Sequence, residues 1–469
     1  MSKSPKQKKK MNRLYLLMLV LVLATVTVLA GCGSSKQTSQ TSTGGSSNSS
    51  VSSPSGSSGD NSANSGKTVK LTLWSIATDL DQQMIRDETD KFNKAQSAIQ
   101  VTPQFFENDP YKDKLRIALG SGNAPDIFFN WGGGPLADYV KAGHVADLTD
   151  LLNNQFVDYK NKFPDSVWGP ATVDGRIYGI PTEGSAVELL YYNKALFAQY
   201  NLNPPETWDD LLHAVRVLKE NGVAPIVLEG KSQWPEMIWV QYLTIRIGGP
   251  QVFEKIAKGE PNAWSDPAVI KALEYVQELV DMGAFQNGYA SMDCCKNQAE
   301  AMLASGKAGM LAQGSWVYNT ILNNYPEMIE EGNLGFVPFP TIDPQYSKAV
   351  VGAPSAYYSV SSKTESVEAA MTYLSEVNYN DAEVDILINQ LGQIPPVKGV
   401  EDLLKVSPNA DFQLWMYDLI AQADTVQLYW DQYLSATTAK ILLDNISKLF
   451  IKQITPQQFV DNMNQTLGK

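Results

Sequence analysis

From residue 67 onward the chain alternates short apolar, β-prone runs with longer stretches whose apolar residues recur at helical spacing. This alternation predicts βαβ units around a parallel sheet, because two parallel strands need a crossover connection, usually a helix. Gly120 ends one helical pattern, and Pro135 and Gly143 bound another. The first series predicts strands at 69–74, 99–106 and 127–130 and helices at 81–95, 111–119 and 135–142.

A second alternating series begins near residue 180, and no short internal repeat accompanies it. We therefore predict an α/β protein of two lobes, each of about 180–220 residues. Periodicity alone places a single boundary between them near residue 180. The second series predicts strands at 187–192, 226–228, 308–311 and 356–360, helices from 194 and at 208–221, 266–282, 316–323 and 367–377, and mostly helix from 411 onward.

The N-terminal segment is typical of an export signal, since basic residues precede an apolar run at 14–30. A retained membrane anchor is the alternative, because the run reaches the lower limit of about 17 residues for a spanning helix. The sequence LAGC at 29–32 resembles the lipobox of bacterial lipoproteins, in which the chain is cut before the cysteine and the cysteine is acylated. This resemblance implies a signal peptide at 1–31, palmitate-type lipid on Cys32, and a protein anchored to the outer face of a bacterial cell membrane.

Residues 33–66 contain 15 Ser and six Gly, with Val51 as the only large apolar residue. Such a segment cannot bury enough apolar surface to offset the entropy of ordering. We expect residues 32–66 to be a lipid-bearing, disordered tether that holds a folded body near the membrane.

The balance of charge excludes several classes of partner. The chain has 50 Asp and Glu against 37 Lys and Arg, and without the six basic residues before the apolar run the difference is 31 against 50, or −19. A body this acidic repels phosphate backbones, so we expect no nucleic-acid partner and a soluble monomer. His144 and His213 are the only histidines, which disfavours a His-rich metal site or a His-dependent hydrolase. We expect no metal and no cofactor.

Cys294 and Cys295 are adjacent in sequence. Neighbouring Cα atoms lie about 3.8 Å apart, below the usual disulfide range of about 4.4–6.8 Å. We therefore expect no structural disulfide between them.

Several short motifs, in a fixed order, resemble one known family. They are SGNAPDI at 121–127 before WGGG at 131–134, YGIP at 178–181, LYYNK at 190–194, PETWDDL at 205–211, GKAGM at 306–310 and GSW at 314–316. Together they resemble the extracellular solute-binding proteins of ABC importers, family 1, and within it the raffinose-type, multiple-sugar-binding members.

This resemblance implies a two-lobe periplasmic-binding-protein fold with hinge-linked lobes and a ligand cleft between them. It places residues 67–182 and 353–395 in one lobe and residues 183–352 and 396–469 in the other. The implied function is a membrane-anchored receptor, not an enzyme, that binds a sugar and delivers it to an ABC import permease. Closure of the lobes on a ligand that touches both is a population shift.

A sugar site needs aromatic faces for C–H groups and planar polar side chains for hydroxyls. Ligands of open α/β sheets bind beyond the carboxyl ends of strands, where Trp74, Asn130 and Trp131 are expected. Gly132 begins a run of three glycines that would let the backbone approach a ligand closely. The alternative is a tight strand-to-helix turn with both tryptophans in the core.

Tyr429, Asp431 and Gln432 occupy positions that, in the raffinose-type relatives, stack on and hydrogen-bond to the terminal sugar. Gln432 departs from the His of those relatives, so the sugar preference need not be shared. The alternative for Asp431 is a helix N-cap. The remaining candidates come from position alone and are Asp79, Glu183, Trp239, Trp316 and Tyr358.

Two other classes of function compete. A secreted glycoside hydrolase would need two carboxylates flanking a cleft, and with 50 acidic residues some pair is always available. No nucleophile-elbow, HExxH or P-loop pattern is present in the sequence. A binding protein for another solute, such as a peptide, is the second alternative.

Overall fold

The computed structural model describes residues 67–182, 184–354 and 356–467. The predicted signal peptide, Cys32, the tether and Glu183 lie outside these described residues. No helix in the described part is long and apolar enough to cross a membrane.

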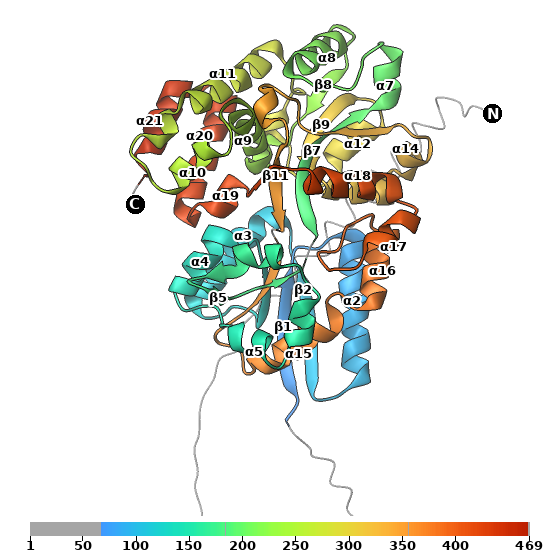
Figure 1. The fold of residues 1–469 in the computed structure, drawn as a ribbon, viewed down its shortest axis with the longest axis vertical. Coiled ribbons are helices and arrows are strands. Elements are labelled where there is room, and N and C mark those ends of the chain that lie inside the picture. Colours follow the sequence, from blue (N-terminus) through green and yellow to red (C-terminus); the bar gives the residue numbers. More distant parts are fainter. Residues whose placement is uncertain (1–66, 183, 355, 468–469) are drawn as a thin grey trace, which may run out of the picture. The chain divides into compact units, whose positions relative to one another are not determined.

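The strands form two main sheets, which define two lobes (Figure 1). The first lobe is built on the order β2-β1-β3-β12-β6, and the second on the order β13-β11-β7-β9-β8, with β10 also paired to β7. The first-lobe strands are β1 (Val69–Ser75), β2 (Ile99–Phe105), β3 (Ile127–Asn130), β6 (Ile180–Pro181) and β12 (Tyr357–Val360), beside the small pair β4 (Thr172–Val173) and β5 (Arg176–Ile177). The second-lobe strands are β7 (Ser185–Asn193), β8 (Ala224–Val227), β9 (Ala308–Gly314), β10 (Leu334–Val337), β11 (Ala349–Pro354) and β13 (Thr425–Gln427).

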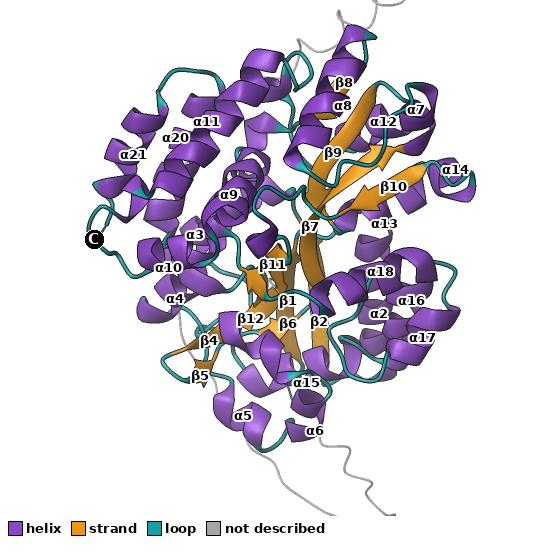
Figure 2. Ribbon diagram, turned by 45° about the horizontal axis from the view of Figure 1, so that its top comes forward, coloured by secondary structure: helices purple, strands orange, loops and turns teal. Residues whose placement is uncertain are grey.

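Helices pack against both sheets (Figure 2). In the N-terminal part they are α2 (Asp79–Ala95), α3 (Asn108–Ser121), α4 (Gly133–Lys141), α5 (Thr149–Asn153), α6 (Val157–Asn161) and η1 (Asp165–Ala171). The middle part has α7 (Lys194–Gln199), α8 (Trp208–Glu220), η2 (Gly230–Ser232), α9 (Trp234–Gly248), α10 (Gln251–Ala257), η3 (Ala263–Ser265), α11 (Pro267–Met282), η4 (Tyr289–Ser291), α12 (Gln298–Ala304), α13 (Trp316–Asn324), α14 (Pro326–Glu330) and η5 (Pro344–Tyr346). The C-terminal part has α15 (Val367–Val377), α16 (Asp381–Asn389), α17 (Glu401–Val406), α18 (Ala410–Ala421), α19 (Trp430–Tyr433), α20 (Ala436–Phe450) and α21 (Pro456–Asn464).

Most of the elements predicted from periodicity are present within a few residues, but the expectation of parallel sheets is wrong in part. β1 pairs in parallel with β2 and β3, whereas β12 is antiparallel to both β3 and β6. In the second lobe β7 is antiparallel to β9, β10 and β11. The reason is that β7 and β12 begin just after the chain has changed sheets, so neither is joined to its neighbour by a βαβ crossover.

The strand β7 shows how the second sheet is buried on both faces. Val187, Leu189 and Tyr191 point into a core shared with α12, α13 and α18, while Leu190 and Tyr192 point into a core shared with α8, α9 and α11. Alternate side chains of a strand point to opposite faces of the sheet. A strand in a sheet with helices on both faces must therefore be almost continuously apolar.

Hydrophobic periodicity did not predict helix α9, because this helix is also buried on all sides. Every residue from Pro235 to Arg246 is buried, so no polar face marks the helix. Its one cation, Arg246, is fully buried and donates hydrogen bonds to the carbonyl oxygens of Phe339 (3.2 and 3.3 Å), Tyr346 (2.6 Å) and Ala349. These bonds fix the loop that leads into β11.

Replacing Arg246 with Met should lower the free energy of unfolding by about 3 kcal/mol, because buried carbonyl groups lose their donors. Urea denaturation of residues 67–469 measures the change. Arg216, exposed on α8, provides the matched control, and its replacement with Met should change the stability by less than about 0.5 kcal/mol. Equal effects of the two substitutions would contradict this role of Arg246.

Candidate functional site

A cavity of about 830 Å³ is lined by residues of both lobes. This volume lies within the range of roughly 300–1,000 Å³ that is common for small-molecule sites. The first-lobe wall includes the segments that follow β1, β2 and β3, so part of the cavity lies at the carboxyl ends of these strands. The second-lobe wall is supplied by the segments after β8 and β9, by the loop before α12 and by α19.

The structure brings the following predicted residues to the cavity wall: Asp79, Trp131, Trp316, Tyr358, Tyr429, Asp431 and Gln432. It places Trp74, Asn130, Gly132 and Trp239 elsewhere. Trp74 packs on Phe106, with 4.9 Å between the ring centroids, and its neighbour Ser75 faces the cavity instead. Trp239 is fully buried between Phe285 and Phe339 in the second-lobe core.

Asn130 and the glycines after it shape the cavity wall indirectly. The Asn130 amide donates to Ser359 Oγ at 2.8 Å, and its Oδ1 accepts from the N–H of Gly132 at 2.9 Å, which joins β3 to β12 and to the start of α4. A Cβ atom at Gly133 or Gly134 would collide with the carbonyl oxygens of Gln432 and Leu434. The glycines therefore admit the backbone around α19, where we had expected a ligand.

Aromatic rings stand on both walls. Trp131 lies edge-on to Phe129 at a centroid distance of 5.1 Å, and Lys112 Nζ is 4.9 Å from the centre of its ring. On the second lobe Trp316 lies 5.8 Å from Trp234, a cavity residue that the sequence analysis did not select. Trp131, Trp234 and Trp316 remain partly exposed, so their rings offer apolar surface to the cavity.

The segment at 429–432 is bound into the second lobe. Tyr429 is buried and donates its hydroxyl to Glu188 Oε1 at 2.9 Å, and burial raises the pKa of Glu188 to about 8. Asp431 lies within α19, whose N-cap is Tyr429, so the alternative role of an N-cap is wrong. Its carboxylate is 3.6 Å from Lys112 Nζ of the first lobe, and the Oε1 atom of Gln432 is buried without a hydrogen-bond partner.

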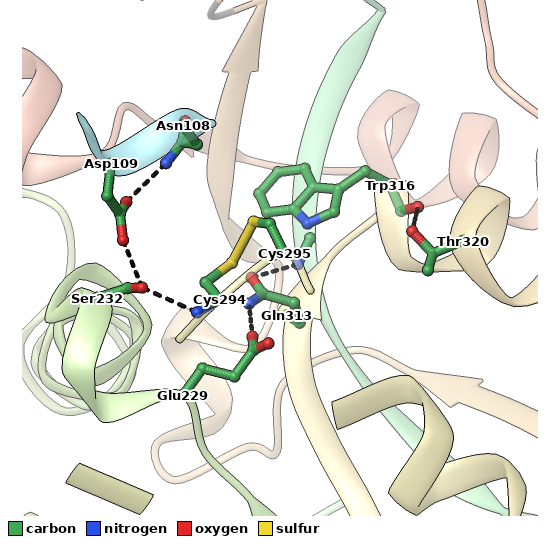
Figure 3. The surroundings of a disulfide bond; sticks show 10 residues. Asn108, Asp109, Glu229, Ser232, Cys294, Cys295, Gln313, Trp316 and Thr320 are labelled. Atoms are coloured by element: carbon green, nitrogen blue, oxygen red, sulfur yellow. Dashed lines mark hydrogen bonds between the residues drawn. A yellow bond between two sulfur atoms is a disulfide. The ribbon is translucent and has the colours of Figure 1, made fainter. Parts of the chain in front are cut away.

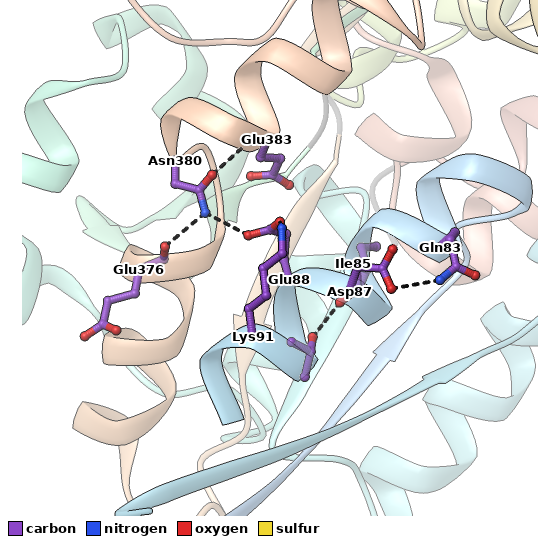
Figure 4. Close-up of polar contacts among 9 residues, drawn as sticks. Gln83, Ile85, Asp87, Glu88, Lys91, Glu376, Asn380 and Glu383 are labelled. Carbon is purple, nitrogen blue, oxygen red and sulfur yellow. Dashed lines mark hydrogen bonds and ion pairs between the residues drawn. The ribbon is translucent and has the colours of Figure 1, made fainter. Parts of the chain in front are cut away.

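Buried carboxyl groups stand beside both walls. In the first lobe Asn380 links Glu88 and Glu383, donating to Glu88 Oε2 at 3.2 Å and accepting from the Glu383 N–H at 2.8 Å (Figure 4). Burial raises the pKa of Glu383 to about 8. In the second lobe Gln313 donates to Glu229 Oε2 at 2.9 Å, and burial with the nearby Glu300 raises the pKa of Glu229 to about 8.

Direct contacts join the two lobes around the cavity, and most of the residues involved were not predicted. Asp81 of the first lobe accepts a hydrogen bond from Asn319 Nδ2 of the second lobe at 3.0 Å, and one from Gln393 Nε2 of its own lobe at 3.1 Å. Burial raises the pKa of Asp81 to about 6. The other contacts are Ser232 Oγ to Asp109 at 2.6 Å, Lys296 to Glu107 at 3.1 Å, and the Ala436 N–H to Asp138 at 3.1 Å.

The adjacent cysteines form a disulfide, so the expectation of no structural disulfide between them is wrong (Figure 3). The Cα atoms are 3.8 Å apart, and Cys295 takes a left-handed backbone conformation with φ +64°. A general spacing rule for disulfides does not foresee this turn, because it describes pairs that are distant in sequence. Both cysteines line the cavity.

No group of three or more His, Cys, Asp or Glu side chains with the geometry of a metal site occurs among the described residues. The cavity wall instead carries aromatic rings, hydrogen-bond acceptors and closely paired charges.

Comparisons with known proteins agree with this architecture. The multiple sugar-binding protein of Streptococcus mutans is 25% identical over 354 residues, which cover 72% of this chain and 80% of that protein. A solved structure from work on xylan utilization by the thermophilic bacterium Caldanaerobius polysaccharolyticus is 30% identical, with a TM-score of 0.75, and the match covers 85% of this chain and 100% of that chain. A chitin oligosaccharide binding protein is 26% identical, with a TM-score of 0.77 over 86% of this chain and 98% of that chain.

The chain spans about half the length of the curated relatives it matches first, between 44% and 58%. The family model of the bacterial extracellular solute-binding proteins matches residues 76–378, which is more than half of the chain. Members of this family bind solutes and are not enzymes, which removes the support for a glycoside hydrolase. With its two α/β lobes and the cavity between them, the chain belongs to the bacterial extracellular solute-binding protein family.

Proposed function

We propose that the protein is a membrane-anchored extracellular receptor that binds an oligosaccharide between its lobes and delivers it to an ABC import permease. The observation that carries this proposal is the cavity with tryptophan rings on both walls, Trp131 on one and Trp316 on the other. The similar proteins are described in terms of multiple sugars, xylan utilization and chitin oligosaccharides, which supports the same class of ligand.

The ion pairs that the cavity lysines already form favour a neutral ligand. Lys112, Lys231 and Lys296 line the cavity, and each already has a carboxylate partner: Asp431, Asp293 and Glu107, at 3.6, 2.8 and 3.1 Å. Among the described lining residues no cation is therefore left for a phosphate or a peptide carboxylate. A sugar needs no such charge, because its hydroxyl groups both donate and accept hydrogen bonds.

The polar groups of the second-lobe wall suit sugar hydroxyls. Gln432 Oε1 is buried and lacks a donor, which is costly unless a ligand supplies one. The Asp431 carboxylate can accept charge-assisted hydrogen bonds beside Lys112. We assign Trp131, Trp316, Asp431 and Gln432 to direct ligand contact, with Asp79 and Tyr358 at the edge of the site. Tyr429 contributes its ring, since its hydroxyl is bound to Glu188.

We further assign residues 67–182 and 353–395 to one lobe and residues 183–352 and 396–469 to the other. The order of the strands supports this division, because β6 and β12 belong to one sheet and β7 and β11 to the other. The chain then crosses between the lobes three times, and these crossings provide the hinge for closure on the ligand.

The anchoring of the receptor is a proposal from the sequence. A signal peptide at 1–31 and acylation of Cys32 would tether a monomeric receptor to the cell membrane through residues 33–66. Metabolic labelling with a palmitate analogue, compared between the wild type and Cys32→Ser, tests this assignment: label retained in Cys32→Ser would contradict it.

The ligand class is tested by thermal unfolding of residues 67–469 with xylo-, chito-, malto- and raffinose-type oligosaccharides, short peptides and phosphate. A ligand at 100 times its Kd adds about 2.7 kcal/mol, which raises Tm by a few degrees. We expect a shift with one class of oligosaccharide, recovered intact. A shift with peptides or phosphate alone would overturn the proposal.

Replacing Trp131 or Trp316 with Ala should weaken binding of that oligosaccharide by about tenfold or more, because each ring supplies apolar stacking surface. Isothermal titration calorimetry measures Kd. Tyr417, an exposed aromatic residue on α18 outside the cavity, is the matched control, and Tyr417→Ala should leave Kd unchanged. If both tryptophan variants bind as tightly as the control, these rings are not the ligand platform.

Closure of the lobes should depend on pH through Asp81. Burial raises its pKa to about 6, and the carboxyl groups of Asp79 and Glu383 are the titratable groups that interact with it. Opening exposes Asp81 to water and returns its pKa toward the ordinary value of 3.8. The closed form thus binds the proton more tightly, so a lower pH favours closure. Affinity for a neutral sugar should rise by about tenfold from pH 7 to pH 5.

The variant Asp81→Asn should lose this dependence, whereas Asp90→Asn, an exposed change on the same helix, should retain it. Titration calorimetry at both pH values gives the comparison. The same rise in affinity in Asp81→Asn would assign the effect to another carboxyl group.

A further inference from the structure

The loop between η4 and α12 carries the disulfide of Cys294 and Cys295 on the wall of the cavity. Cys294 is buried and Cys295 is exposed. Figure 3 shows the disulfide together with Trp316, one of the proposed ligand platforms, and all three residues line the cavity. The disulfide and Trp316 therefore belong to the same cavity wall.

The backbone of this loop is bound to the first lobe through one serine. The N–H of Cys294 donates to Ser232 Oγ at 2.9 Å, and the Ser232 hydroxyl donates to Asp109 Oδ2 of the first lobe at 2.6 Å. The residue after the disulfide, Lys296, forms an ion pair with Glu107 of the same lobe at 3.1 Å. The loop that holds the disulfide thus contacts both the cavity and the opposite lobe.

The conformation of the loop is one that a free chain avoids. Cys295 and Asn297 both have left-handed backbone angles, with φ +64° and +57°. Asn adopts this conformation more readily than most residues with a Cβ, whereas Cys seldom does. A covalent link between neighbouring side chains restricts the residues to few backbone states, and its removal frees the loop to leave the conformation in which Cys294 and Lys296 reach the first lobe.

We propose that the Cys294–Cys295 disulfide is a ligand-contact surface of the sugar site and that its reduction weakens both sugar binding and lobe closure. The inference rests on the proposed function as far as the sugar is concerned. The disulfide offers a polarisable sulfur surface to the C–H face of a sugar on the same cavity wall as Trp316. An extracellular location is compatible with a stable disulfide.

Reduction of the Cys294–Cys295 disulfide proceeds by thiol–disulfide exchange with a dithiol. One thiolate of the dithiol attacks a sulfur atom of the pair, the S–S bond breaks, and a mixed disulfide forms. The second thiol of the reagent then attacks the mixed disulfide and releases the protein cysteine that was bound in it. The protein gains two electrons and two protons as two thiols, and the dithiol becomes a disulfide.

The test compares the full chain before and after treatment with dithiothreitol, with alkylation and mass spectrometry to establish the state of the bond. Calorimetric titration with xylotetraose and chitotetraose should show a Kd about tenfold higher for the reduced protein. The double variant Cys294→Ser/Cys295→Ser should bind like the reduced protein, and dithiothreitol should not change it further. Circular dichroism checks that both forms remain folded.

A second measurement needs no sugar. Hydrogen exchange of residues 107–112 and 230–233 should accelerate on reduction, because the contacts of Ser232 and Lys296 with the first lobe are lost. Unchanged exchange together with equal Kd values in the oxidised and reduced protein would overturn the inference. If neither sugar binds in either state, the proposed function fails for these two sugars, and the exchange rates alone decide whether the disulfide controls closure.

Discussion

The backbone contact between the start of α4 and the segment around α19 determines how one side of the cavity is built. Gly133 and Gly134 of the first lobe lie against the carbonyl groups of Gln432 and Leu434 of the second, at a distance that no Cβ atom permits. This approach places Trp131 opposite Asp431, with Lys112 contacting both. A larger residue at either glycine would separate the two walls, and the polar and aromatic groups would no longer face a common ligand.

Buried carboxyl groups hold the walls in place without adding charge to them. Glu188 supports Tyr429, Glu229 is bound to Gln313, and Glu383 lies next to Glu88. Burial raises the pKa of Glu188, Glu229 and Glu383 to about 8, so these groups are largely neutral at physiological pH and act as hydrogen-bonding supports. A carboxyl group in its neutral form can be buried at much lower cost than a carboxylate.

The sequence predicted most of the elements and part of the site, and the differences have physical reasons. Periodic amphipathic segments such as 81–95 and 208–221 were recognised because one face of each is polar, whereas α9 has no polar face to detect. Trp131, Asp431 and Gln432 were found from strand ends and family motifs. Asp81, Trp234 and Gln313 were not, since their position at the cavity depends on how distant segments pack. Trp74 points away because adjacent strand residues face opposite sides, so that Ser75 faces the cavity.

The exposed ion pair and the single hydrogen bonds between the lobes are each weak. The ion pair of Lys296 with Glu107 is between side chains 44% and 67% exposed, and such pairs contribute about 0–1 kcal/mol. The hydrogen bonds of Ser232 and Asn319 add about 1 kcal/mol each, and the entropy of holding the hinge opposes them. Shifting an equilibrium from 1:99 to 99:1 requires about 5.5 kcal/mol of differential binding. A ligand with micromolar affinity has a binding free energy of about −8 kcal/mol, so a ligand that contacts both tryptophan walls can supply this difference.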